Sequence, residues 1–217
     1  MKASTREALW FHALFFVASL PVLFFTHGTL FGKGLLLLTL GYNIALPIFA
    51  LVRGHTEWLK LWIFLLPLSC GQVLPDWALV QIAGVLTFPD HGAWRISGAV
   101  PVYFMGLWMM LLFPVTLISD NMRSRYFAAA ILSLVLFGFW EWAAQPLQLW
   151  QPQNVRTIAG VAIYVLIPEV FLGLATLHAY RNTRGSGIIQ QVFSALSVNL
   201  LYTGALFISL LLTRSLL

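Results

Sequence analysis

The sequence predicts an all-α polytopic membrane protein, a bundle of seven transmembrane helices that forms a single domain over residues 1–217. Three observations lead to this class. Hydrophobic residues make up 60% of the 217 positions, and charged residues only 9%. The mean hydropathy of +0.87 lies far above that of soluble globular proteins. The apolar residues also form separate runs long enough to cross a bilayer, which requires about 20 residues at a rise of about 1.5 Å per residue.

Seven apolar segments satisfy that length requirement. The first is expected to be a retained helix and not a cleaved signal peptide, because its apolar run continues to Phe25 without a small-residue cleavage site. The longest connection, residues 87–97, is rich in turn-forming residues. The expected spans are 7–26, 31–52, 58–84, 97–118, 126–149, 157–180 and 189–213.

The distribution of basic residues predicts the orientation. If the N-terminus is cytoplasmic, eight of the twelve Lys and Arg residues fall on the inner side and four on the outer side. Because short cytoplasmic loops are enriched in Lys and Arg, this favours an N-in, C-out topology. The basic residues are scattered singly between apolar runs, so the partners expected are membrane lipids and no nucleic acid. The expected location is the bacterial inner (plasma) membrane, and the sequence predicts no particular oligomeric state.

Three carboxylic acids lie inside the expected spans: Asp76, Glu141 and Glu169. An ionised acid near the bilayer centre costs about 2.5 to 3.5 kcal/mol, so we expect all three to face the interior of the bundle. Lys33 and Lys60 lie at the ends of their spans, and no Lys or Arg lies deeper in a span to pair with the acids. Burial favours the neutral form of a carboxyl group, so some of the three are expected to hold a proton.

Polar and aromatic residues accompany these acids. Ser69 and Gln72 precede Asp76 by two turns and one turn, which places the three on one face of a helix. We therefore expect a cavity whose wall contains Asn43, Gln72, Trp77, Tyr103, Trp108, Trp140, Trp142, Tyr164, Asn199 and Tyr202. Other tryptophans near helix ends are expected to be interfacial anchors: Trp10, Trp58, Trp62 and Trp150. A purely structural network of hydrogen bonds between helices is an alternative role for the acids.

Several catalytic patterns are missing. The sequence contains neither H-E-x-x-H nor G-x-S-x-G, which argues against membrane metalloproteases and serine hydrolases. Paired aspartates of the D-x-x-x-D type are also missing, and the seventh span has no Lys for a retinal Schiff base. His12 and His178 are both expected near the inner side, but lone histidines in membranes are more often packing groups than haem ligands. We therefore expect no metal and no cofactor.

Protonated acids beside aromatic faces suit carbocation chemistry on a lipid-soluble substrate. A carboxylic acid can protonate an alkene or epoxide, and aromatic rings stabilise the resulting cation. Asp76 or Glu141 would be the initiating acid and Glu169 the partner acid or terminating base, with Asn43, Gln72 and Asn199 orienting them. The same acids would also suit a proton-linked transporter or ligand-binding membrane protein. A structural subunit of a larger complex is the third alternative.

One segment resembles a known group of membrane enzymes. Residues 88–114, "FPDHGAWRISGAVPVYFMGLWMMLLFP", are similar to the pattern in carotenoid-biosynthesis hydratases, where a turn-rich loop leads into a G-x-P helix. The isolated acids in short helices also resemble membrane lycopene cyclases and the terpene cyclases of meroterpenoid pathways. The resemblance covers roughly residues 70 to 175, and the adjacent acid pair of lycopene cyclases has no counterpart here. It implies an isoprenoid cyclase, hydratase or isomerase.

Overall fold

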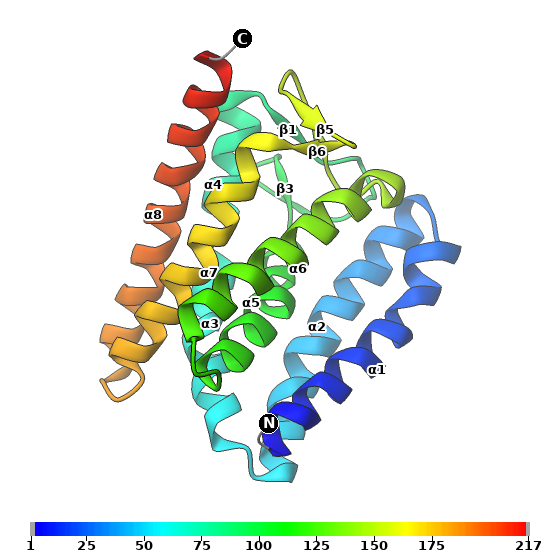
Figure 1. The fold of residues 1–217 in the computed structure, drawn as a ribbon. Helices are drawn as coiled ribbons and strands as arrows, with labels where there is room; N and C mark the ends of the chain where they lie inside the picture. Colours follow the sequence, from blue (N-terminus) through cyan, green and yellow to red (C-terminus); the bar gives the residue numbers. More distant parts are fainter. Residues whose placement is uncertain (1–2, 216–217) are drawn as a thin grey trace.

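The structure, a computed structural model, describes residues 3–215 and consists mainly of long helices (Figure 1). Glycines mark the ends of two of these helices. The second helix is capped by Gly54, which adopts φ 71°, and the third helical span is capped by Gly84 with φ 64°. The helical elements are α1 (Ala3–Phe25), α2 (Gly28–Arg53), α3 (Thr56–Gly71), α4 (Val73–Ala78), the π-helical segment η1 (Leu79–Ala83), α5 (Phe104–Asp120), α6 (Arg125–Leu147), α7 (Ile163–Thr183) and α8 (Ile188–Ser215). This confirms the all-α polytopic class.

Six helical segments of the described residues are long and apolar enough to cross a membrane. One of them runs without a loop through α3, α4 and η1, from Thr56 to Ala83. The helix is interrupted at Gln72, because Pro75 has no N–H to donate to the carbonyl of Gly71, one turn earlier. The seventh, α5, has only 17 residues, or about 26 Å of helix. Crossing by all seven segments therefore remains a prediction.

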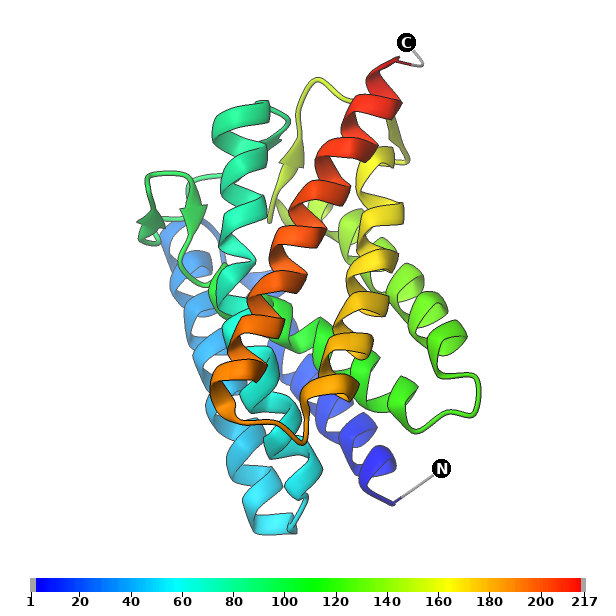
Figure 2. The same cartoon turned by 90° about the vertical axis from the view of Figure 1, so that its left-hand side faces the viewer.

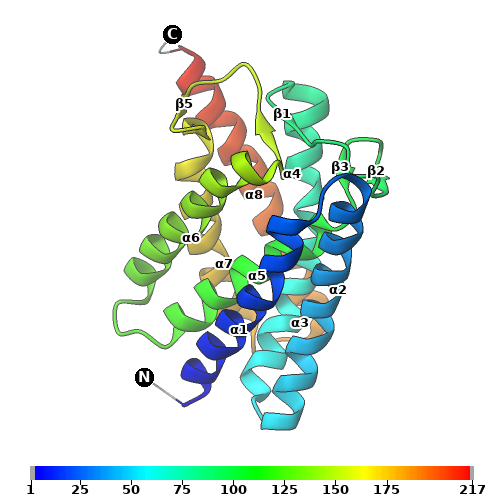
Figure 3. The same ribbon diagram turned by 90° about the vertical axis from the view of Figure 1, so that its right-hand side faces the viewer.

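Helix α5 occupies the centre of the bundle. It packs against α1, α2, α3, α6 and α7, while α8 packs on α3, α4 and α7 (Figures 1 and 2). Because its side chains contact protein on several sides, α5 does not need to match the thickness of the hydrocarbon layer. Figure 3 shows α1 and α2 as a pair on one side of α5, with α6 on the other side. The N-terminus and the C-terminus lie at opposite ends of the molecule (Figure 1).

Short strands form most of the ordered structure outside the helices, and they correct two expected boundaries. The strands are β1 (Leu86–Thr87), β2 (Arg95–Ile96), β3 (Val100–Pro101), β4 (Gln151–Pro152), β5 (Thr157–Ile158) and β6 (Val161–Ala162). Hairpin β2–β3 precedes α5, and hairpin β5–β6 precedes α7. The predicted starts at 97 and 157 were therefore wrong, since the two helices begin at Phe104 and Ile163.

Positive φ angles explain why these apolar segments turn instead of continuing as helix. Ser97 and Gly98 adopt φ 48° and 69° in the first hairpin, and Ala159 and Gly160 adopt φ 51° and 85° in the second. Left-handed residues of this kind close short hairpin loops. The antiparallel pair β1–β4 then joins the two long connections, at the end of the molecule that carries the C-terminus (Figure 1).

Ion pairs are found at the opposite end, near the N-terminus. Arg53 at the end of α2 donates to Glu7 of α1 at 2.8 Å. Asp120 at the end of α5 accepts hydrogen bonds from Arg181 and from Arg184, the latter at 2.9 Å. These pairs join α1 to α2 and α5 to the C-terminal end of α7.

Helices α6 and α7 approach each other closely at one glycine. A Cβ atom added to Gly173 of α7 would lie 1.8 Å from Oγ of Ser133 in α6. Ser133 is fully buried, so a methyl group at Gly173 would displace a side chain that is packed on all sides. The missing side chain of Gly173 therefore sets the distance between the two helices.

Candidate active site

A cavity of about 610 Å³ lies in the bundle and is lined by residues from α1, α2, α4, η1 and α5 to α8. Its wall includes four strongly exposed residues. Leu9 and Phe16 of α1 are each 42% exposed, and Val135 and Phe139 of α6 are 59% and 45% exposed. The cavity thus extends from the buried centre to the outer flank between α1 and α6, where apolar side chains would face lipid. Such a volume is typical of sites for small organic ligands.

The three intramembrane acids all line this cavity. Asp76 comes from α4, Glu141 from α6 and Glu169 from α7. Asp76 is 6% exposed and Glu169 is 3% exposed, whereas Glu141 is partly exposed within the open cavity. The expectation that the acids face the interior is confirmed for all three. None of them forms an ion pair with another described residue.

Glu141 and Glu169 interact directly. Both side chains line the cavity, Glu141 from α6 and Glu169 from α7, and their carboxyl groups are close enough to influence each other. A carboxylate has no hydrogen to donate, so a hydrogen bond between two carboxyl groups requires one of them to be protonated. Oε2 of Glu169 is buried and accepts no hydrogen bond from an N–H or hydroxyl donor in the described part of the chain.

Two indole N–H groups donate hydrogen bonds to Asp76 and Glu141. Nε1 of Trp108 donates to Oδ2 of Asp76 at 3.3 Å, and Nε1 of Trp150 donates to Oε1 of Glu141 at 3.2 Å. A neutral donor of this kind fixes the orientation of a carboxyl group without adding a positive charge.

Trp150 is a site residue that the sequence analysis assigned wrongly, as an interfacial anchor. On a helix continuing through residue 149 it would lie about 13 Å along the axis from Glu141, too far for contact. In the structure α6 ends at Leu147, and Gln148 adopts a left-handed φ of 54°. The chain then turns back and brings Trp150 beside the acid. The left-handed residue after Pro146 is a local signal that hydropathy alone does not reveal.

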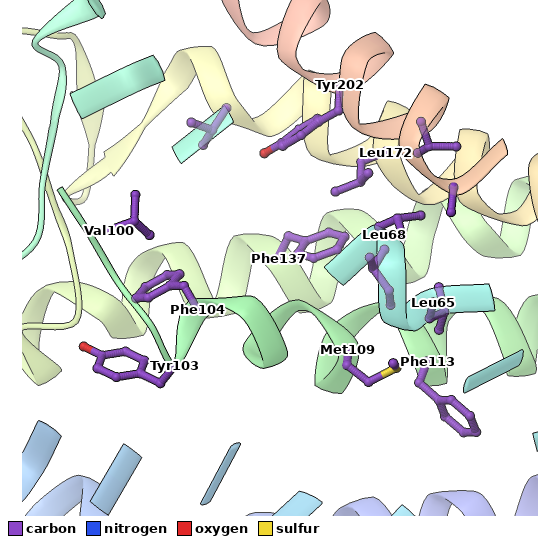
Figure 4. Close-up of a cluster of buried hydrophobic side chains, with 14 of the residues drawn as sticks. Leu65, Leu68, Val100, Tyr103, Phe104, Met109, Phe113, Phe137, Leu172 and Tyr202 are labelled. Atoms are coloured by element: carbon purple, nitrogen blue, oxygen red, sulfur yellow. The ribbon is translucent and has the colours of Figure 1, made fainter. Parts of the chain in front are cut away.

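Four of the expected aromatic residues line the cavity: Trp108, Trp140, Tyr164 and Tyr202. Phe137, which the sequence analysis did not select, joins them, and its ring centroid lies 5.8 Å from that of Trp108. Tyr202 is 5.9 Å from Trp108 by the same measure. Figure 4 shows Phe137 and Tyr202 extending into the interior from opposite sides.

Three amide residues expected to orient the acids lie elsewhere. Nε2 of Gln72 donates to Oδ1 of Asn199 at 2.9 Å, so this pair joins α3 to α8. Nδ2 of Asn43 donates to the carbonyls of Thr39 and Gly106, at 2.9 and 3.3 Å. None of the three is part of the cavity wall or bonds to an acid. These buried amides therefore form hydrogen bonds within and between helices and do not orient the acids.

Three expected aromatic residues also lie outside the cavity wall. Trp77 is half-buried against the hydrophobic core, and Trp142 is 52% exposed. Tyr103 is buried beside Phe104, on the side of the chain away from Tyr202 (Figure 4). Burial raises the pKa of the Tyr103 hydroxyl, which has no hydrogen-bond partner among the described residues. The anchor role expected for Trp58 is wrong, because this residue is fully buried.

A second cavity of about 570 Å³ adjoins the first. The two share Phe16, Leu23, Phe139 and Trp140 in their walls. The second lies toward the α1–α2 connection and the end of α6, and it also contacts His27. The two cavities together form a continuous apolar flank along α1 and α6.

The histidines considered as haem ligands have separate partners. The ring nitrogens of His12 contact the Ala8 carbonyl and the Tyr42 hydroxyl. His178 contacts Tyr126 and Asn182 on the exposed surface. Within residues 3–215, no group of three His, Cys, Asp or Glu side chains is arranged to hold a metal ion.

Fold and site together define a polytopic α-helical membrane protein with an acid-containing, aromatic-lined cavity that opens on its apolar flank. The chain belongs to the family described as "Domain of unknown function (DUF6989)", which matches residues 73–213. The matched region contains all three acids, while α1 and α2, which complete the cavity wall, lie outside it. Comparison with curated proteins and with solved structures gave no match.

Proposed function

We propose that this protein is a metal-independent, acid-initiated cyclase of a bilayer-dissolved isoprenoid, with hydratase or isomerase chemistry as close variants. The observation that carries the proposal is the convergence of Asp76, Glu141 and Glu169 on one aromatic-lined cavity. General acid chemistry on an alkene requires a carboxyl group that is protonated and shielded from water. The proximity of Glu141 and Glu169 supports the first requirement, because neighbouring buried carboxyl groups favour retention of a proton, and the apolar wall supports the second.

The proposed reaction needs only the side chains of the cavity to give and accept protons. Asp76 or Glu141 gives its proton to one carbon of an alkene, or to the oxygen of an epoxide, and becomes a carboxylate. The neighbouring carbon becomes cationic, and a second double bond of the same chain attacks it and closes a ring. Glu169, or the acid that started the reaction, then accepts a proton from the carbon next to the new cation. The product is an isomer of the substrate; attack by water would instead give a product heavier by one water molecule.

The aromatic residues support the cationic stage. Trp108, Trp140 and Tyr202 present rings to the same cavity as the acids. A cation over such a ring gains about 2 kcal/mol when water is excluded. The open flank between α1 and α6 supports entry of the substrate directly from the lipid phase.

We also propose that all seven helical segments cross the membrane, with the N-terminus inside, in the bacterial inner (plasma) membrane. Opposite positions of the two termini support an odd number of crossings (Figure 1). The excess of basic residues at the N-terminal end supports the direction. In this orientation the acids lie in the half of the bilayer nearer the outer surface.

The proposal is tested by incubating the purified protein in lipid nanodiscs with prenylated quinones, linear terpenoids and carotenoid extracts. Products are separated by chromatography and weighed by mass spectrometry. We expect an isomeric or hydrated product with the wild type, and a loss of at least about a hundredfold in rate with Asp76→Asn, Glu141→Gln or Glu169→Gln. Glu57→Gln is the matched control, because Glu57 lies in the first turn of α3, away from the cavity.

The proposal fails if no isoprenoid is converted and the three amide variants also match the wild type in a cellular assay. A proton-linked transporter is the second candidate, since the neighbouring acids Glu141 and Glu169 also suit proton-coupled binding. Proton-coupled uptake into liposomes without any chemical product would favour it. Stoichiometric co-purification with another membrane protein, together with tolerance of all three amides, would favour a structural subunit.

A further inference from the structure

The cavity has a second polar group, away from the acids. His12 of α1 and Tyr42 of α2 both contribute to its wall. Nε2 of His12 lies 2.7 Å from the Tyr42 hydroxyl, and Nδ1 lies 2.7 Å from the Ala8 carbonyl. The ring of Phe113 stacks on His12 with a centroid distance of 5.7 Å. The pair is thus held rigidly from three helices.

The hydrogen-bond partners define which atom can receive a ligand. The Ala8 carbonyl can only accept, so Nδ1 of His12 must carry a hydrogen. In the neutral ring Nε2 is then an acceptor, and it receives the hydrogen of the Tyr42 hydroxyl. The Tyr42 oxygen keeps a free lone pair but has no further hydrogen to give. The pair can therefore accept a hydrogen bond from a ligand and cannot donate one.

The two polar groups lie at different levels of the bundle, as their contacts with α5 show. Trp108 holds Asp76, and Phe113 stacks on His12. These two residues of α5 are five positions apart, which is about 7.5 Å along the helix axis. Apolar side chains, among them Leu111 and Phe15, line the cavity as well. The cavity accordingly combines an acid cluster, an apolar wall and a hydrogen-bond acceptor.

We propose that the Tyr42 oxygen, oriented by His12, binds a hydroxyl group on the substrate, so that the substrate class is an isoprenoid alcohol or phenol. The inference rests on the proposed function, because it places the reacting double bond at the acids. A ligand that ends in an ether or a carbonyl has no hydrogen to donate and would leave this acceptor unpaired, which costs binding energy. The pair therefore selects for a hydroxyl at a position remote from the bond that reacts.

Binding of two matched probes, farnesol and farnesyl methyl ether, tests this selection. Affinity is measured in nanodiscs from the change in tryptophan fluorescence. We expect the wild type to bind the alcohol about five- to tenfold more tightly than the ether, the range of one hydrogen bond. The preference should fall in Tyr42→Phe and reach about one in the double variant His12→Leu/Tyr42→Phe. Ser19→Ala is the control, because Ser19 also carries a hydroxyl in the cavity wall but bonds to the Phe16 carbonyl.

A second variant separates this inference from the proposed function. The triple variant Asp76→Asn/Glu141→Gln/Glu169→Gln should lose turnover and keep the preference for the alcohol, which shows that the acids are not its source. Equal binding of both probes by the wild type would overturn the inference, as would loss of the preference in Ser19→Ala or in the triple variant. A preserved preference in a protein that converts no isoprenoid would instead overturn the cyclase and leave the hydroxyl site standing.

Discussion

At the scale of single residues, the site uses neutral donors where many enzymes use charged ones. Trp108 and Trp150 each donate one indole N–H to an acid. An arginine in either position would keep its partner ionised and remove it as a proton donor. Indole N–H groups orient the carboxyl groups and leave proton exchange between Glu141 and Glu169 open.

Replacing one indole tests this role. In Trp150→Phe the ring remains, but the hydrogen bond to Glu141 at 3.2 Å is lost. We expect turnover to fall about tenfold or more, the cost of an unpaired hydrogen bond to an ionisable group, with the protein still folded. Trp142→Phe is the control, because Trp142 is next to Glu141 in sequence but 52% exposed and outside the main cavity wall. Equal rates for the two variants would show that the indole N–H does not matter.

The sequence allowed the acids to be predicted as inward-facing because the cost of exposing a charge to lipid is large and local. It did not predict their partners. Gln72 and Asn199 are polar and at suitable depth. They nevertheless bond to each other, because the packing of α8 on the third helical span places them in contact. Trp150 becomes a partner only because α6 ends at Leu147 and the chain reverses. Such choices depend on the arrangement of helices, which single residues do not encode.

At the scale of elements, hydropathy located every long helix but misplaced two starts. Residues 95–101 and 157–162 are largely apolar and adjoin the helices that follow them, so a hydropathy window includes them. The chain nevertheless turns at Ser97–Gly98 and Ala159–Gly160, where φ is positive. Small residue pairs with glycine inside apolar runs were the signal for these hairpins.

The contact between α6 and α7 gives a test at this scale. Gly173→Ala would place a methyl group 1.8 Å from Oγ of Ser133, so the helices must separate or Ser133 must move. We expect a loss of about 1 to 3 kcal/mol of stability, measured by thermal melting in detergent. The double variant Ser133→Ala/Gly173→Ala should recover part of this loss. Gly138→Ala in α6 is the control, since nothing lies within 4 Å of its added methyl group, and it should be neutral or slightly stabilising.

At the scale of the whole molecule, the central helix α5 is surrounded by protein, whereas α1 is largely exposed. Seven crossings require the two termini to lie on opposite sides of the membrane.

Reporter fusions to the C-terminus test this topology directly. We expect an active alkaline phosphatase and a non-fluorescent green fluorescent protein at the C-terminus, and the reverse for a reporter placed in the connection between α2 and α3. If the C-terminus and the α2–α3 connection were found on the same side of the membrane, α5 would not cross it.

The opening between α1 and α6 has one further consequence. A molecule that reaches the acids through this flank is drawn from the two-dimensional lipid phase, so the rate depends on its mole fraction among lipids and detergent and not on its amount per volume of buffer. Adding inert detergent at constant substrate would then slow the reaction by surface dilution alone, and long acyl chains would compete for the same gap.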